Sequence, residues 1–484
     1  MNKFLQNIFI LFILTRCYIS IIVIPFKTYI NPEPEKFQNN SDIFLYWTKN
    51  ILYTTTLIGT PSQNITLLLN SQSFSSSIFY HMCDIPFSSY EKEKSSSYSF
   101  VKNINSFSIM KNATVIEETV YLYSDLNCKK LKPYKPLTII YSPNDKNSQG
   151  NSYEYHSNTC MNVGFQLSWI SFDEIQSNLI LQLKNNLKII ETRDFTFEYL
   201  TKTEGRIVIG AEPHFYDEEK YSEKQYRISY AVSNDGINLH DFFLNFDNIF
   251  VNCKNKYSGK KYNESISMVK SAKIVIDMGM IIAPKGYKEI IDRVLFNDLI
   301  KEKKCHEEKP KDYIFYYCDK IYESEIKNNF PNLYFDMKQF HKIFELTYED
   351  LFRIKNDKIF FLIYFRQSTF SSFFELGKIF LQKYSFTFNP ETKMIGYYNF
   401  DLPGGKNKNE KKEEKNFFKN IYVWIGIFIV VFIFGILGFF FGKMVYYKVR
   451  KKRVNEVEDD NYDYNPQKNN ENNEKDKLYD DSDD

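Results

Sequence analysis

The 484-residue sequence has no excess charge of either sign and few histidines. Its formal net charge is +2, so the composition implies no nucleic-acid partner. The six histidines are scattered and form no HExxH pair, and neither a GxSxG motif nor a phosphate-binding P-loop occurs. The usual signatures of zinc proteases, serine hydrolases and nucleotide-binding enzymes are therefore missing, and we expect no metal and no cofactor.

Cysteine is scarce, with seven residues in the whole chain. Cys17 lies in the apolar N-terminal stretch, and the spacing of the other six fits no zinc site. An even set of six in a secreted chain favours disulfides. Only Cys305 and Cys318 are close enough in sequence for a pairing to be predicted. The pairing of the rest stays open for Cys83, Cys128, Cys160 and Cys253.

Two apolar stretches predict entry into the secretory pathway and a membrane anchor. Residues 1–24 read as a signal peptide, with apolar Ile8–Leu14 after the charged Lys3. Residues 421–442 carry no charge, are long enough to span a bilayer, and are followed by a basic cluster at 443–453. The sequence predicts a single-pass type I membrane protein whose ectodomain lies in the secretory lumen or at the cell surface.

Differences in composition divide the rest of the chain into segments. Residues 25–48 are polar and read as an irregular lead-in, residues 401–420 as a stalk, and residues 443–484 as a disordered cytoplasmic tail. Four sequons are candidates for glycosylation on the lumenal side: Asn39, Asn64, Asn112 and Asn263.

The ectodomain has the pattern of a mainly β protein. Short apolar or alternating runs such as Thr114–Leu122 and Gly205–Gly210 are separated by Gly, Pro, Asn and Ser. Two longer stretches, Phe172–Asn186 and Lys285–Leu299, read as helices. We therefore predict an all-β fold with a few short helices. The chain is too long for one hydrophobic core, so we expect at least two.

One pattern, a buried strand that ends in a small polar loop, occurs twice. Ile65–Leu69 leads into Asn70-Ser71-Gln72-Ser73, and Lys273–Ile276 leads into Asp277-Met278-Gly279-Met280. Such a turn commonly presents a reactive side chain. The repeat predicts two related β lobes that bring one loop each to a shared cleft, an N-terminal lobe over 49–215 and a C-terminal lobe over 216–400.

These two loops resemble the active-site regions of the pepsin family of aspartic proteases, in which a strand leads into an Asp-Thr-Gly loop. Other segments resemble the family in the same order, so the resemblance covers about residues 48–400. It implies a bilobal β fold with a cleft between the lobes and a β-hairpin flap near Asn105–Val120, although that stretch lacks the family's usual Tyr and Gly pattern. The further segments are Glu91–Phe100, Gly205–Tyr216, Phe243–Val251 and the stretch around Leu376-Gly377.

The resemblance also implies a defect in the catalytic centre. In the family, two carboxylates share one proton around a water molecule, and their mutual repulsion separates their pKa values. Asp277 keeps the second position, but Asn70 stands at the first and cannot act as a base. Met278 replaces a threonine whose hydroxyl joins the hydrogen-bond network, Gln72 replaces a glycine, and Met280 replaces a hydroxyl residue.

We therefore favour a membrane-anchored homologue of pepsin-like aspartic proteases without catalysis, which keeps the interlobe cleft for a peptide or protein ligand. The alternative is a divergent but active aspartic endopeptidase that uses Asp277 as its one carboxylate and Asn70 as a hydrogen-bond donor. A third hypothesis is a surface adhesion protein that binds through the outer faces of its lobes.

Overall fold

The computed structural model describes residues 20–29, 39–70, 77–79, 90–104, 113–142, 160–164, 178–230, 242–254, 260–266, 269–310, 312–367, 372–402 and residue 443. Residues 1–405 form one compact unit and residues 406–484 a second. No helix within the described ranges is long and apolar enough to cross a membrane. The predicted span 421–442 lies outside them, as do residues 1–19 of the predicted signal.

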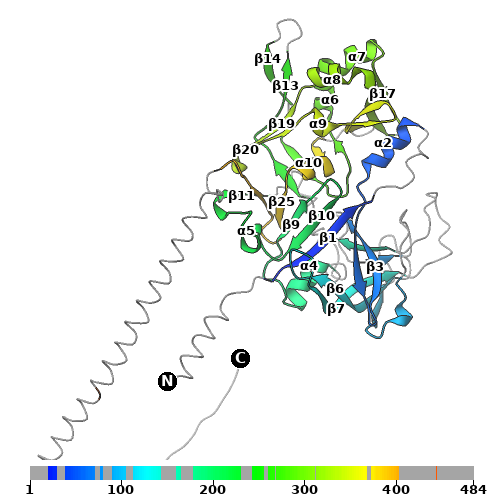
Figure 1. The fold of residues 1–484 in the computed structure, drawn as a ribbon, viewed down its shortest axis with the longest axis vertical. Helices are drawn as coiled ribbons and strands as arrows, with labels where there is room; N and C mark the ends of the chain where they lie inside the picture. Colours follow the sequence, from blue (N-terminus) through cyan, green and yellow to red (C-terminus); the bar gives the residue numbers. More distant parts are fainter. Residues whose placement is uncertain are drawn as a thin grey trace, which may run out of the picture. The chain divides into compact units, whose positions relative to one another are not determined.

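Six strands at one end of a 13-stranded sheet join the two halves of the first unit (Figure 1). At their centre β9 and β25 pair antiparallel, with Thr196 opposite Thr387. A hairpin from the middle of the chain therefore lies beside a hairpin from its end. The strands follow in the order β11 (Tyr226–Tyr230), β26 (Met394–Tyr398), β25 (Phe386–Asn389), β9 (Phe195–Tyr199), β10 (Glu204–Ile209) and β1 (Ile22–Thr28).

The first half continues the same sheet beyond β1. The order is β2 (Leu52–Ile58), β3 (Gln63–Asn70), β8 (Cys160–Gly164), β4 (Ser77–Phe79), β7 (Leu131–Ser142), β6 (Ala113–Tyr123) and β5 (Ser99–Ile104). Strand β3 pairs antiparallel with β2 and parallel with β8. Strand β4 pairs antiparallel with β8 and parallel with β7.

The second half forms a nine-stranded sheet of its own. Parallel and antiparallel pairings alternate along it as in the first half. The order is β12 (Phe243–Asn245), β15 (Ser271–Ile274), β24 (Phe374–Leu376), β16 (Ile281–Ile282), β23 (Ile363–Arg366), β18 (Tyr313–Asp319), β22 (Lys358–Phe361) and β21 (Phe352–Lys355), with β17 (Cys305–Glu308) paired to β18.

The two halves are related by a duplication of topology. The run β2-β3-β8-β4-β7-β6 in the first half matches β12-β15-β24-β16-β23-β18 in the second, strand for strand in order and in direction. Within each run the strands also follow the same sequence in the chain. The prediction of a mainly β fold built on a repeated strand-and-loop element is confirmed.

A smaller sheet and several short helices complete the second half. The helical prediction over Lys285–Leu299 is confirmed by α6, a π-helical turn and α7, and residues 179–186 are helical at the end of the predicted Phe172–Asn186 helix. The sheet is β14 (Lys261–Ser265), β13 (Asn248–Lys254), β19 (Leu333–Met337) and β20 (Lys342–Leu346). The helices are α2 (Asn40–Thr48), α4 (Leu179–Leu181), α5 (Pro213–Tyr216), α6 (Lys285–Ile291), α7 (Asn297–Lys301), α8 (Glu323–Asn329), α9 (Tyr348–Leu351) and α10 (Lys378–Lys383).

The predicted irregular lead-in over residues 25–48 is wrong where the structure describes it. β1 is buried and pairs with β10 from Ile22 to Lys27, so a signal peptide ending at residue 24 would cut through a core strand. Helix α2 begins after Asn39, whose side chain accepts a hydrogen bond from Asp42 N–H. Both elements are stabilised by partners distant in sequence, which composition alone does not reveal.

Candidate functional site

Asn70 is the last residue of β3. It lies opposite Gly164 at the end of the parallel pair that β3 forms with β8. The structure therefore places Asn70 at the carboxyl end of β3. The other three residues of the predicted loop, Ser71, Gln72 and Ser73, lie outside the described residues.

Asp277 occupies the matching place in the second half. It follows β15, which pairs parallel with β24, and the Val275 N–H donates to Leu376 O at 3.0 Å just before it. A glycine, Gly377, follows β24, as Gly164 ends β8 in the first half. The Asp277 residue is partly exposed, whereas Met278 and Met280 beside it are buried. The sequence pattern indicates Leu376-Gly377 but gives no signal for Gly164, its counterpart in the first half.

The backbone of the Asp277 loop is bound by the last residues of α2 and by the residues that follow this helix. Gly279 N–H donates to Thr48 O at 2.8 Å, and Asn50 N–H donates to Asp277 O at 2.9 Å. The Asn50 amide also donates to Ile276 O at 2.7 Å. A Cβ on Gly279 would lie 2.1 Å from Trp47 O, so the close approach requires glycine here. The loop is thus fixed by a segment predicted to be irregular.

Met278 fills an apolar position under the loop. Its residue is 7% exposed, and its sulfur accepts a weak hydrogen bond from the Tyr364 hydroxyl at 3.9 Å. Its carbonyl accepts from Lys378 N–H at 2.7 Å. Met280 is 1% exposed within the same core. The residues that replace hydroxyls in the resemblance are therefore packed as core residues.

A polar cluster beneath the loop was not predicted. The Lys378 ammonium donates to Thr28 Oγ1 at 3.2 Å, and the Asn50 amide donates to the Tyr199 hydroxyl at 2.9 Å. Burial, together with the nearby Arg353, lowers the pKa of Lys378 to about 8. Asn50 is 1% exposed, and its side-chain oxygen has no hydrogen-bond partner. In the sequence, Lys378 directly follows Leu376-Gly377, and this position is the sequence signal that could have indicated the cluster.

The predicted flap coincides with the hairpin of β5 and β6. The two strands pair from Ser99–Glu117 to Ile104–Ala113. The connecting residues 105–112, which include Phe107 and the sequon at Asn112, lie outside the described residues. A hairpin is therefore present where the resemblance placed the flap, and its tip is not described.

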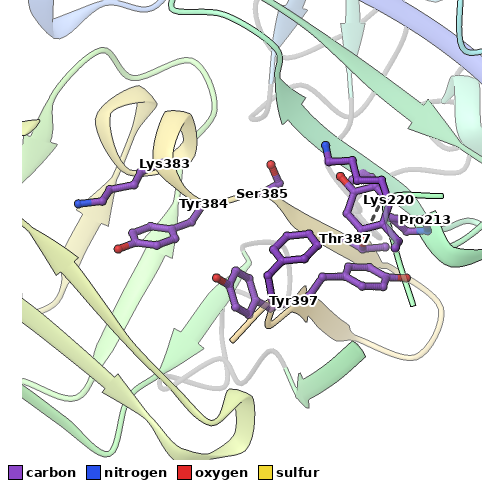
Figure 2. A pocket seen from close by; sticks show the side chains of 11 residues that line it. Pro213, Lys220, Lys383, Tyr384, Ser385, Thr387 and Tyr397 are labelled. Carbon is purple, nitrogen blue, oxygen red and sulfur yellow. Dashed lines mark hydrogen bonds between the residues drawn. The ribbon is translucent and has the colours of Figure 1, made fainter. Parts of the chain in front are cut away.

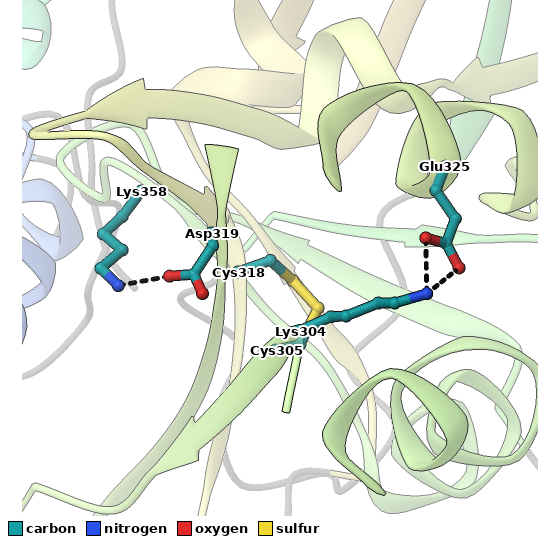
Figure 3. Close-up of a disulfide and its surroundings, with 6 residues drawn as sticks. All are labelled: Lys304, Cys305, Cys318, Asp319, Glu325 and Lys358. Atoms are coloured by element: carbon teal, nitrogen blue, oxygen red, sulfur yellow. Dashed lines mark hydrogen bonds and ion pairs between the residues drawn. A yellow bond between two sulfur atoms is a disulfide. The ribbon is translucent and has the colours of Figure 1, made fainter. Parts of the chain in front are cut away.

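The predicted disulfide is confirmed. Cys305 and Cys318 are bonded across the β17–β18 hairpin, with Lys304 and Asp319 next to them (Figure 3). Cys128 and Cys253 are free thiols, which corrects the expectation that all six cysteines pair. Cys253 is buried, and burial raises the pKa of its thiol to about 11.

Three of the four sequons fall on described residues, and each asparagine is exposed. Asn39 caps α2, Asn64 lies in β3, and Asn263 lies in β14. Glycosylation of all four stays a prediction. Within the described ranges, no group of three or more His, Cys, Asp or Glu side chains is placed to hold a metal ion.

Comparisons with known proteins bear on the fold. No family model matches the sequence, and no curated protein matches it. Basic 7S globulin from soybean is similar in structure at 11% identity, covering 78% of this chain and 95% of its own, with a TM-score of 0.49. Conglutin gamma, a basic 7S globulin from lupine seeds, is similar at 12% identity with the same coverage and a TM-score of 0.50.

The chain has a pepsin-like fold. The identity is too low for more than the fold, so neither globulin carries information on ligand or activity to this chain. The duplicated halves and the shared six-stranded sheet agree with that assignment.

Proposed function

We propose that this chain is a membrane-anchored pepsin-like protein without aspartic protease activity, whose interlobe cleft binds a peptide or protein. The main support for the proposal is the set of residues in the Asp277 loop. Asp277 is retained, but Met278 and Met280 are buried beside it, and the first half offers only the amide of Asn70.

The chemical reason is the loss of a proton-sharing pair. A lone carboxylate has no like-charged neighbour to separate two pKa values, so an acid and a base do not coexist at one pH. General acid–base catalysis contributes roughly 10²–10⁴-fold per group. The Asn70 amide can donate a hydrogen bond but cannot accept and return a proton.

Ligand binding in the cleft is supported by what the fold retains. Both loop-bearing strands hold matching positions in the duplicated halves, and a hairpin is present at the flap position. The Asp277 residue, which follows the second of these strands, is partly exposed. The secretory location and the anchor at 421–442 rest on the sequence alone.

The first experiment measures peptide cleavage. Full-length protein in detergent micelles is incubated with a fluorogenic peptide library between pH 3 and pH 7, beside Asp277→Ala. We expect no cleavage above the level of the variant. Cleavage that Asp277→Ala abolishes would establish the alternative, an active endopeptidase.

The second experiment measures binding. A peptide-like aspartic protease inhibitor is titrated onto the full-length protein, and we expect saturable binding that Asp277→Ala weakens. An absence of binding would contradict use of the cleft and would favour adhesion through the outer faces.

A restoration variant tests the explanation itself. Asn70→Asp with Met278→Thr and Gln72→Gly restores the family pattern at three of the four substituted positions. Acid-dependent cleavage by this variant, abolished by adding Asp277→Ala, would show that these substitutions silence the site. Inactivity of a folded restoration variant would show that the defect lies elsewhere in the cleft.

A further inference from the structure

A small cavity lies at the central sheet, away from the two loops. Its volume is about 110 Å³, and it is bounded by β9, β25 and β26 together with the segments around α5 and α10 (Figure 2). Five aromatic side chains and two lysines account for most of its wall. They are Tyr221, Tyr384, Tyr397, Tyr398 and Phe400, with Lys220 and Lys383.

Three of the aromatic rings are held in place by their hydroxyl groups. Tyr398 Oη lies 2.6 Å from His214 Nδ1, and the Tyr221 hydroxyl donates to Glu198 at 3.0 Å. The Tyr384 hydroxyl donates to the backbone oxygen of Glu345 at 3.0 Å. Because the hydroxyls point into these bonds, each ring is fixed before any ligand arrives, which lowers the entropic cost of binding.

The rings also pack against one another. The Tyr221 centroid lies 4.7 Å from that of Tyr398 and 5.8 Å from that of Phe400. Phe400 is 54% exposed, an unusual exposure for phenylalanine that leaves ring surface available at the cavity. A flat aromatic ring matches such walls in shape and in quadrupole.

Two hydroxyl groups on the wall are not used within the protein. Neither Tyr397 nor Ser385 has a hydrogen-bond partner among the described residues, although both line the cavity. At its floor, Thr196 and Thr387 share a single hydrogen bond of 2.9 Å. The cavity therefore offers polar contacts as well as apolar area.

Two lysines lie at the rim, and each takes part in an ion pair. Lys220 forms an ion pair with Glu198, whose other oxygen is bound by Arg206 at 3.0 Å. The Lys220 side chain is 47% exposed, and an ammonium has three donors, so it can bind a second acceptor. Lys383 is bound to Asp350 at 2.7 Å. The remaining donors of the Lys220 ammonium favour a ligand with an acceptor such as a carboxylate.

We infer that this cavity binds an aromatic ring that carries a nearby carboxylate. The ring would lie among Tyr221, Tyr398 and Phe400, and the carboxylate would contact Lys220. A cavity of about 150 Å³ accommodates benzene, so a volume of about 110 Å³ limits the ligand to one ring that partly protrudes. Such chemistry occurs in a free aromatic acid and in the C-terminal aromatic residue of a peptide.

The experiment compares matched ligands on the full-length protein. Saturation-transfer NMR and calorimetry are performed with 3-phenylpropionate, with its neutral amide, and with N-acetyl-glycyl-phenylalanine. We expect the acid to bind about tenfold more tightly than the amide, as a charge-assisted hydrogen bond requires. Tighter binding of the peptide than of the free acid would identify a chain terminus as the ligand, and the reverse order would identify a free acid.

Variants then locate the binding. Lys220→Met should reduce binding of the acid to the level of the amide and leave the amide unchanged, which shows that the cavity is intact. Phe400→Ala should weaken both ligands, and Lys285→Met on the exposed side of α6 should change neither. Equal affinity for acid and amide, an absence of saturable binding, or equal effects of Lys285→Met and Lys220→Met would overturn the proposal.

Discussion

The two halves of this molecule share one strand order, but their corresponding hairpins differ in a crosslink. In the second half, the Asp277 loop is bound on one side by Thr48 and Asn50 and on the other by Lys378 N–H. The corresponding hairpin strands there, β17 and β18, are also closed by a disulfide. The first-half hairpin of β5 and β6 contains no cysteine. Topology is therefore shared, while the disulfide across this pair of strands is particular to the second half.

The comparison also separates fold from chemistry. Asp277 lies in a loop beside the buried Met278 and Met280, and Asn70 is the last residue of β3 in the other half. A pepsin-like fold needs only the paired strands and the close glycines. Aspartic proteolysis needs two carboxylates, which the strand pairing itself does not require.

The largest expected effect comes from Gly377→Ala. A Cβ there would lie 2.4 Å from the carbonyl oxygens of both Met278 and Met280, which are fixed backbone atoms. We expect the free energy of unfolding to fall by about 4 kcal/mol, measured by urea denaturation. Gly164→Ala tests the matching position in the first half. A loss below about 1 kcal/mol for Gly377→Ala would show that the loop carbonyls can move aside.

Removal of the disulfide tests the difference between the two hairpins. Cys305→Ser with Cys318→Ser opens a loop with a sequence separation of 13, so we expect a loss of about 3 kcal/mol in urea denaturation. Cys128→Ser, a free thiol in the first half, is the matched control and should change stability little. Equal losses in both variants would mean that the crosslink does not distinguish the halves.

The sequence predicted those parts of the fold that have a local signal. The strand-to-loop elements at Asn70 and Asp277, the Leu376-Gly377 turn and the close pair Cys305 and Cys318 each show in a short segment. Their placement by the structure follows from alternation and spacing, which local sequence expresses directly.

The rest depended on long-range pairing. Ile22–Ile24 continues an apolar run and reads as part of a signal, although β10 pairs with it some 180 residues later in the chain. Helix α2 depends on the stacking of Phe44 on Phe315, with centroids 4.1 Å apart. Lys378 contacts Thr28 and the ring of Tyr199 only in the folded chain, because both are distant from it in sequence. No window of sequence contains such partners.

Lys378→Met tests the polar cluster beneath the Asp277 loop. Folding lowers the pKa of Lys378 from 10.5 to about 8, so the folded state binds fewer protons than the unfolded state between these values. The free-energy cost of burying the charged Lys378 is therefore complete below pH 8, and it is relieved as the pH rises toward 10.5. We therefore expect Lys378→Met to raise the free energy of unfolding by about 2 kcal/mol at pH 7, and this gain should shrink at higher pH.

The pH profile of this variant is the informative readout. Lys285→Met, in which a largely exposed lysine is removed from α6, controls for the change in net charge. A difference between wild type and Lys378→Met that stays constant from pH 7 to pH 10 would mean that packing, and not the buried charge, determines the effect.

The smallest effect lies where the two halves meet. Thr196 and Thr387 face each other across β9 and β25, are each 2% exposed, and share one hydrogen bond. Replacing either threonine with valine leaves the other hydroxyl buried and unpaired, so each single variant should lose about 1 kcal/mol in urea denaturation. The two losses should be equal if the halves are equivalent at this position.

The double variant Thr196→Val with Thr387→Val decides between pairing and independence. Removing both hydroxyls leaves no unpaired group, so its loss should be smaller than the sum of the two single losses. Additive losses would show that each hydroxyl acts alone. Unequal single losses would show that the environments of β9 and β25 differ even at the centre of the shared sheet, and that the duplication extends to strand order but not to energetics.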